Sequence, residues 1–185
     1  GYLPVKVNDT FKQGRYRVVR KQGVFLYLCN RLHQSSFCAN MNHSWGHFST
    51  VWLVKDSQSV SLYFHSLCHS PYHVAFSRTN THSALKVVKS AGRYAETARD
   101  EIKLLSQVSS VSPNHPGRSH IVSFLDSFTH QGPESAHVCI VFEPLGENLL
   151  ALIERNKKKG VPRAVVKIIA KQMLLGLQYL HDECD

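Results

Sequence analysis

The order of hydrophobic periodicities is the feature that most constrains what this 185-residue chain can fold into. Apolar and polar residues alternate in three early segments, 14–23, 48–56 and 82–90, and this period of two indicates β-strands. The period then changes in 94–108, where Ala98, Ile102 and Leu105 share one helical face. The sequence therefore predicts three strands followed by one helix.

The second half of the chain continues with two strands and then two helices. A loop rich in Pro, Gly, Ser and Asn spans 112–120, and strands are predicted in 121–130 and 137–146. Helices are predicted in 147–160 and 162–184. The fold class is therefore α+β, with a five-stranded antiparallel sheet, one helix inserted after the third strand, and the start of a helical region.

The last predicted helix carries one apolar stripe. Its spacing is typical of a long buried helix, and the stripe consists of Val166, Ile169, Met173, Leu177 and Leu180.

Composition limits the classes of protein that this chain can belong to. The hydrophobic content of 43% is sufficient for a core, and a net charge of +9 suits an acidic partner, a nucleotide or a nucleic acid. We found no membrane-length apolar run and no leader, and so expect a soluble, intracellular protein. Five cysteines without CxxC spacing indicate neither a disulfide framework nor a zinc ribbon.

Several segments, in their order and spacing, resemble the N-lobe of protein kinases, and specifically the SR-protein kinases that phosphorylate Arg/Ser-rich splicing factors. They are "VVRKQG", "WGHFSTVWLVKD", "ALKVVKSAGRYAETARDEIKLL", "VCIVFEPLGENLL" and "IIAKQMLLGLQYLH". The resemblance implies an N-lobe and hinge in 1–146 and the beginning of the C-lobe in 147–185. It also implies ATP and Mg²⁺ as cofactors and a place in the cytoplasm and nucleus.

The resemblance assigns roles to several residues of the first half. Gly46 fits the second glycine of the turn that covers the phosphates, and Ser49 stands where many kinases have the third. Val51 fits the valine that covers adenine. Lys86, which follows Ala84 in the third strand, matches the lysine that holds the α- and β-phosphates.

The resemblance also assigns the lysine's partner and the hinge. Glu101, fifteen residues after the lysine, matches the glutamate that pairs with it. Phe142 matches the gatekeeper, and the backbones of Glu143 and Leu145 would take the hydrogen bonds of adenine. An isolated lysine or glutamate is usually a solvated charge, so it is their joint spacing between a glycine turn and a hinge-like segment that favours the functional reading.

Two stretches interrupt the resemblance, 24–44 and about 59–78. Without the first, Gly23 and Gly46 form the expected G-x-G turn. Both stretches are rich in Ser, His, Cys, Phe and Leu and lack acidic residues, so we interpret them as translated introns. His65, His69 and His73 near Cys68 could bind zinc on a helix, but a proline at position 71 interrupts that helix.

The family's catalytic aspartate and its magnesium ligands would follow Asp185. We therefore expect little or no phosphoryl transfer by residues 1–185, and we expect the apolar stripe of the last helix to be exposed. A non-catalytic nucleotide-binding or interaction module remains an alternative. A basic nucleic-acid-binding protein is another, which only the net charge supports.

Overall fold

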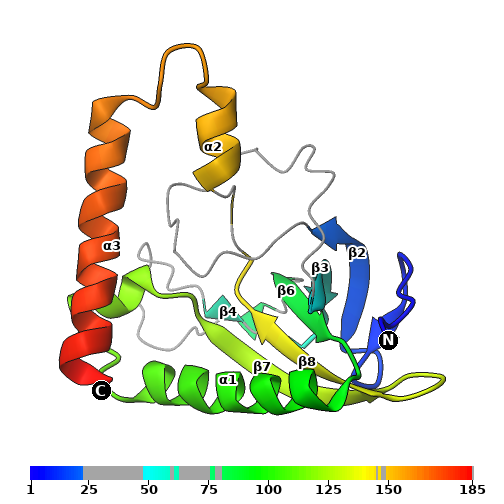
Figure 1. Ribbon diagram of the computed structural model, residues 1–185. Coiled ribbons are helices and arrows are strands. Elements are labelled where there is room, and N and C mark those ends of the chain that lie inside the picture. The colour runs from blue at the N-terminus through cyan, green and yellow to red at the C-terminus, as the bar shows by residue number, and fades with distance from the viewer. Residues whose placement is uncertain are drawn as a thin grey trace.

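The computed structural model describes residues 1–22, 48–58, 61–62, 76–77, 81–144, 146 and 149–184. Figure 1 shows a sheet with a long helix along one side and a helical region beyond it. The strands are β1 (Thr10–Phe11), β2 (Tyr16–Gln22), β3 (Ser49–Asp56), β4 (Ser61–Leu62), β5 (Phe76–Ser77), β6 (Thr81–Val88), β7 (Phe124–Gln131) and β8 (Ala136–Phe142). The helices are α1 (Gly92–Ser110), the 3₁₀ helix η1 (Pro116–His120), α2 (Leu149–Arg155) and α3 (Arg163–Glu183).

The main sheet contains the five predicted strands and one more. Its order is β1-β2-β3-β6-β8-β7, and every neighbouring pair is antiparallel. The additional strand, β1, has two residues, which is too short to show a period in the sequence. A second sheet pairs β4 with β5, inside the second stretch that interrupts the family resemblance.

The main sheet curls until its two edges approach each other. The ring of Tyr16 near one edge stacks on Phe128 of the opposite edge strand, with centroids 5.7 Å apart, and Phe11 lies 4.5 Å from the ring of His130. The curl encloses a core in which Tyr16 is fully buried. Since β1 and β7 are not hydrogen-bonded neighbours, side chains and not main-chain bonds close the curl.

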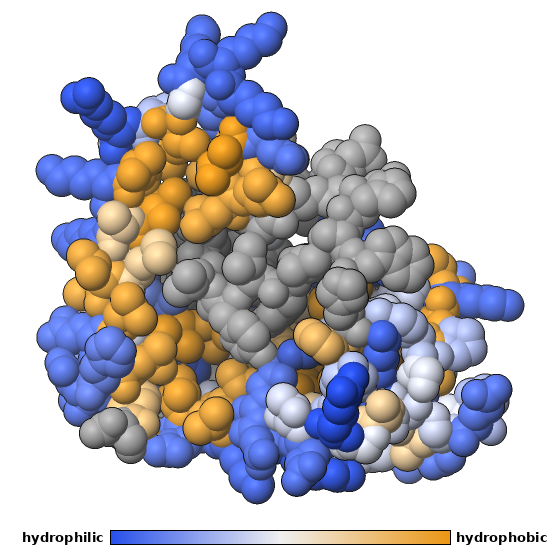
Figure 2. All heavy atoms as spheres, viewed as in Figure 1, coloured by the Kyte–Doolittle hydropathy of each residue, from blue (hydrophilic) through white to orange (hydrophobic). Residues whose placement is uncertain are grey.

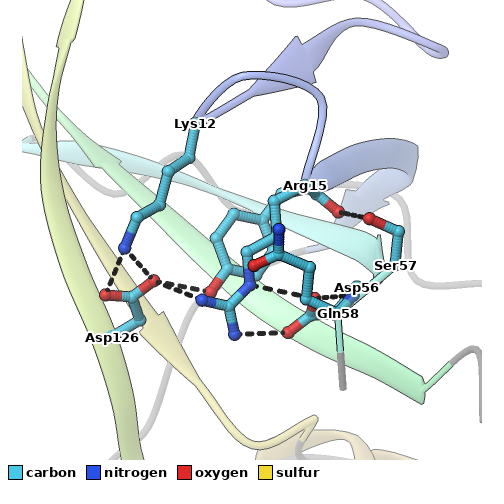
Figure 3. A network of polar contacts seen from close by, with 7 residues as sticks. Lys12, Arg15, Asp56, Ser57, Gln58 and Asp126 are labelled. Atoms are coloured by element: carbon cyan, nitrogen blue, oxygen red, sulfur yellow. Dashed lines mark hydrogen bonds and ion pairs between the residues drawn. The ribbon is translucent and has the colours of Figure 1, made fainter. Parts of the chain in front are cut away.

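A network of polar contacts also holds the two edges of the curled sheet together (Figure 3). The carboxylate of Asp126 on β7 accepts hydrogen bonds from Lys12 at 2.6 Å and from the hydroxyl of Tyr16 at 2.7 Å. Arg15 donates to Asp126 at 3.3 Å and to both oxygens of Asp56 at 3.0 Å. The β1–β2 turn is thereby fixed to β3 and to the far edge of the sheet.

The other face of the sheet packs against α1. Ala98 and Leu105 are the fully buried residues of this helix, and they join a second core with Val51, Ala84 and Ile140. In Figure 1 the helix runs along the sheet beside β7 and β8. The predicted amphipathic helix is therefore confirmed, and its apolar face positions the helix on the strands that carry the candidate site.

The helical region differs from the sequence expectation at the end of α2. The helix ends at Arg155 and not near position 160, and the N–H of Asn156 makes a turn hydrogen bond to Ile153 O at 3.0 Å. Residues 147 and 148, where the helix was expected to begin, lie outside the described residues. Gly160 has a positive φ of 72°, which suits the glycine stop signal that we expected near this position.

The expectation that α3 is a long buried helix is wrong. Its fully buried residues are Gly176 and Tyr179, which face η1. Val166 and Leu177 of the predicted stripe are 49% and 40% exposed, which agrees with the expectation that the stripe is exposed. Figure 2 shows apolar residues on the surface in the region of α2 and α3. Within the residues that the structure describes, no helix is long and apolar enough to cross a membrane.

Candidate functional site

Lys86 lies in the middle of the sheet, on the face that packs against α1. In the register it is opposite Val51 of β3 on one side and Ile140 of β8 on the other. Because side chains alternate along a strand, Ala84 points to the same face two residues earlier. Phe142, the last residue of β8, is opposite Ala84. The central strands β3, β6 and β8 therefore place the lysine among apolar side chains.

Glu101 approaches this lysine from the helix. The Nζ atom of Lys86 donates to Oε1 of Glu101 at 2.7 Å and to Oε2 at 2.8 Å. Glu101 lies three residues after Ala98 and four before Leu105, so the burial of these two residues turns it toward the sheet. The contact between Lys86 and Glu101 that the family resemblance implies is therefore present in the structure, whereas their roles toward a nucleotide stay predictions.

Burial affects the charges of both partners. The side chains are 15% and 21% exposed. Desolvation lowers the pKa of Lys86 to about 8 and raises the pKa of Glu101 to about 7. Each group needs the opposite charge in order to stay ionised in this place. The arrangement therefore holds an aimed ammonium group that can bind an anion on the face of the sheet that packs against α1.

The apolar residues around the lysine belong to one core cluster. Val51, Ala84 and Phe142 are all buried, with exposures of 6%, 1% and 0%. They come from three strands, β3, β6 and β8, that are neighbours in the sheet. Apolar side chains beside a cation suit a ligand with an aromatic part and an anionic part.

The segment after β8 is held by a residue that the sequence did not indicate. Glu143 N–H donates to Ser123 O at 3.0 Å, and Ser123 N–H donates back to Oε1 of Glu143 at 2.9 Å. Because the N–H of Glu143 is already hydrogen-bonded to Ser123 O, the carbonyl of Glu143 is its backbone group that could bind a ligand. No sequence pattern marks Ser123, since its role depends on where the preceding loop returns to β8.

Part of the predicted site lies outside the described residues. This holds for Gly23 and Gly46 of the expected phosphate turn and for Leu145 of the hinge-like segment. The strands that flank the turn are described: Gln22 is opposite Val51, and Ser49 begins β3 on the same face as Val51. The two predicted strands on either side of the turn are therefore present and paired, and the turn itself stays a prediction.

The metal interpretation of the second interruption also lies outside the described residues, because His65, Cys68, His69 and His73 are not among them. Among the residues that are described, no group of three His, Cys, Asp or Glu side chains could hold a metal ion.

Comparison with known families identifies the class of protein that this fold and site define. The family model "Protein kinase domain" matches residues 70–184. A solved crystal structure of a kinase domain has a TM-score of 0.67 with this chain at 20% identity, and covers 98% of this chain and 39% of its own. At 20% identity, this similarity is evidence for the fold alone. This chain belongs to the protein kinase domain family.

Curated relatives narrow the resemblance to the SR-protein kinases. "Protein kinase dsk1" of Schizosaccharomyces pombe is 41% identical over 184 residues, which cover all of this chain and 26% of the relative. "Serine/threonine-protein kinase SKY1" of Saccharomyces cerevisiae is 40% identical and "SRSF protein kinase 3" of Homo sapiens 42% identical; this chain matches 20% and 25% of their lengths. The chain thus spans about a quarter of the length of these relatives. The resemblance stated from the sequence is confirmed.

Proposed function

We propose that this chain forms the ATP-binding lobe of a serine/threonine protein kinase that phosphorylates Arg/Ser-rich proteins of mRNA splicing. The family match and the names of the relatives support the general class. The observation that carries the proposal is the bidentate ion pair between Lys86 and Glu101, 2.7 and 2.8 Å long, on the face of the sheet that packs against α1.

The described residues fit an adenine nucleotide. Lys86 would bind the α- and β-phosphates while Glu101 keeps it charged and aimed. Val51 and Ala84 would pack on adenine, and Phe142 would close the space behind it. The carbonyl of Glu143 would accept a hydrogen bond from adenine, since its N–H is used by the chain itself.

The other proposed contacts lie at the turn and the hinge. Gly23 and Gly46 would bring backbone N–H groups to the phosphates, with Ser49 at the end of the turn. The backbone of Leu145 would supply the second hydrogen bond to adenine. These roles rest on position in the sequence and on the flanking strands β2, β3 and β8.

Bound ATP would supply the γ-phosphoryl group, with Mg²⁺ neutralising the charge that develops during transfer. The residues that would hold Mg²⁺ and accept the substrate proton are not among those described. Because positioning and charge neutralisation carry this reaction, we propose that residues 1–185 bind ATP with little or no transfer. The Arg/Ser-rich substrate and the location in cytoplasm and nucleus stay predictions from the resemblance.

The first experiment is thermal unfolding of the chain with and without Mg·ATP. We expect ATP to raise the Tm of the wild type, because a ligand that binds only the folded state stabilises it. The Lys86→Ala variant should lose this rise. Lys103→Ala is the matched control, since Lys103 is an exposed lysine on α1 whose contact is with Asp100.

A second assay tests turnover on an Arg/Ser-repeat peptide, with a Lys/Ser-repeat peptide as the specificity control. Mg²⁺-dependent transfer by residues 1–185 would contradict the proposed division between binding and chemistry. Equal stabilisation of the wild type and Lys86→Ala by ATP would contradict the proposed site itself.

A further inference from the structure

A cluster of rings and cations surrounds the first turn of α1. We call it the Tyr94 cluster, and it consists of Tyr2, Phe48, Lys89, Arg93 and Tyr94. The ring centroids of Phe48 and Tyr94 lie 5.0 Å apart. Lys89 Nζ lies 4.0 Å from the ring centroid of Tyr2 and 6.0 Å from that of Tyr94. The Arg93 guanidinium lies 4.7 Å from the Tyr94 ring. Segments far apart in the sequence therefore meet at Tyr94.

Backbone hydrogen bonds fix the partners of Tyr94 to the end of β6. Lys89 N–H donates to Phe48 O at 3.0 Å, and Ser90 N–H donates to Gly1 O at 3.1 Å. Phe48 directly precedes β3, at the place where the predicted phosphate turn returns to the sheet. The Tyr94 ring connects these segments to α1 through its contacts with Phe48 and Lys89.

The start of α1 lacks the usual helix-capping interactions. Its N-cap residue is Ala91, which makes no side-chain cap hydrogen bond, and the first turn contains no acidic residue. Helices normally use such groups to fix their first turn. The Tyr94 cluster supplies an anchor at this end of the helix.

The anchor is connected to the ion pair by the helix itself. Tyr94 and Glu101 are seven residues apart, so they share one face and lie about 10 Å apart along the axis. A tilt of the first turn would therefore change where Glu101 meets Lys86, because the intervening two turns move with it.

We infer that Tyr94 is a positioning residue that holds α1 against Phe48 and thereby keeps Glu101 on Lys86. Its role is not catalytic, since it acts through Glu101 and not on the nucleotide. This inference deepens the proposed nucleotide site and rests on it for the binding readout described next.

The test compares ATP with adenosine in equilibrium binding to the folded chain. Tyr94→Ala should weaken ATP binding about tenfold, the factor expected when a contact to a charged group is lost. Adenosine lacks phosphates, so its affinity should change by less than about twofold. Tyr94→Phe, which keeps the ring, should bind ATP like the wild type. So should Leu104→Ala, a control at an exposed position of the same helix.

A second readout requires no nucleotide. The titration of the Glu101 carboxyl, followed by ¹³C NMR, should move toward its ordinary pKa in Tyr94→Ala, because the displaced side chain gains water. If Tyr94→Ala does not fold, Phe48→Leu removes the same ring contact from a side chain that is 57% exposed, and the same two changes are expected.

The outcomes separate the two proposals. A folded variant with an unchanged ATP-to-adenosine affinity ratio, or with an unchanged Glu101 titration, overturns the role of Tyr94. If the wild type binds neither ATP nor adenosine, the proposed function fails, and the Glu101 titration alone decides the positioning role.

Discussion

The Lys86–Glu101 ion pair should contribute almost nothing to folding, although each partner depends on the other. The perturbation that shows this is a double-mutant cycle with Lys86→Met, Glu101→Gln and the two together. In such a cycle the single variants leave one buried charge without its partner, whereas the double variant removes both charges.

The magnitudes follow from the burial and the distance. Desolvation gives Lys86 a pKa of about 8 in place of 10.5 and Glu101 a pKa of about 7 in place of 4.5, and each difference corresponds to about 3 kcal/mol. At the 2.7 Å separation, the attraction at an effective dielectric constant of about 20 is about 6 kcal/mol. The attraction and the two desolvation costs therefore nearly cancel.

The assay is urea unfolding at pH 7.5, with the free energy of unfolding extrapolated to water. Each single variant should be less stable than the wild type by about 3 kcal/mol, because it loses the attraction and keeps one desolvation cost. The double variant should fall within about 1 kcal/mol of the wild type. Additive losses in the double variant would refute the reasoning, since they would mean that the two charges do not depend on each other.

The same variants give a pH dependence with a definite sign. Burial raises the pKa of Glu101 from 4.5 to about 7 in the wild-type chain. In Lys86→Met the carboxyl stays buried and has lost its cation, so its pKa stays raised and the folded state binds more protons than the unfolded state above pH 4.5. Its contribution to stability is present below pH 4.5 and is lost as the pH rises to about 7. Lys86→Met should therefore match the double variant at pH 4.5 and become less stable than it by pH 7.5. Parallel pH profiles would contradict this.

Three further outcomes follow from the structure. Asp126→Asn should lower the free energy of unfolding by about 2 kcal/mol, because three donors lose a charged acceptor. The partners of Asp126 lower the pKa of its carboxyl group, so the difference between variant and wild type should shrink as acid protonates the wild-type carboxylate. Gly117→Ala should lower the stability of the folded chain by more than about 2 kcal/mol, since the added Cβ would lie 2.1 Å from Leu175 O. The added Cβ of Gly92→Ala meets open space, so this variant should be as stable as the wild type. Thermal unfolding compares the two variants. Cys139 is buried and its pKa is raised to about 12, so iodoacetamide at pH 8 should leave it unmodified in the folded chain by peptide mapping.

The strands and the paired charges could be predicted because their signals are local. A period of two fixes the face of β6 on which Lys86 lies, and a period near four fixes the face of α1 on which Glu101 lies. Once the helix packs through Ala98 and Leu105, these two faces must oppose each other. The two periods are consistent with the contact that the structure shows at 2.7 Å, but it was the resemblance to the kinase family, at its spacing of fifteen residues, that singled out this lysine and this glutamate.

The closure of the curled sheet could not be predicted in this way. Asp126 meets Lys12 and Arg15 across more than a hundred residues, and these residues belong to opposite edges of the sheet. In the sequence each is an isolated charge at a turn or on a strand, which is usually solvated. Only the curl, set by packing between Tyr16 and Phe128, brings them together.

The Tyr94 cluster combines both situations, and this explains why its role becomes visible only with the structure. The helical period shows from sequence alone that Tyr94 shares a face with Glu101. It does not show that Phe48 and Lys89 arrive at the same place, because that depends on how β3 and β6 pair and on where the chain leaves each strand. The lysine and glutamate of the site can therefore be found by matching the sequence to the kinase family. The contacts that hold the helix at the correct height above the sheet come from tertiary structure, and variants there should alter phosphate binding without touching the nucleotide.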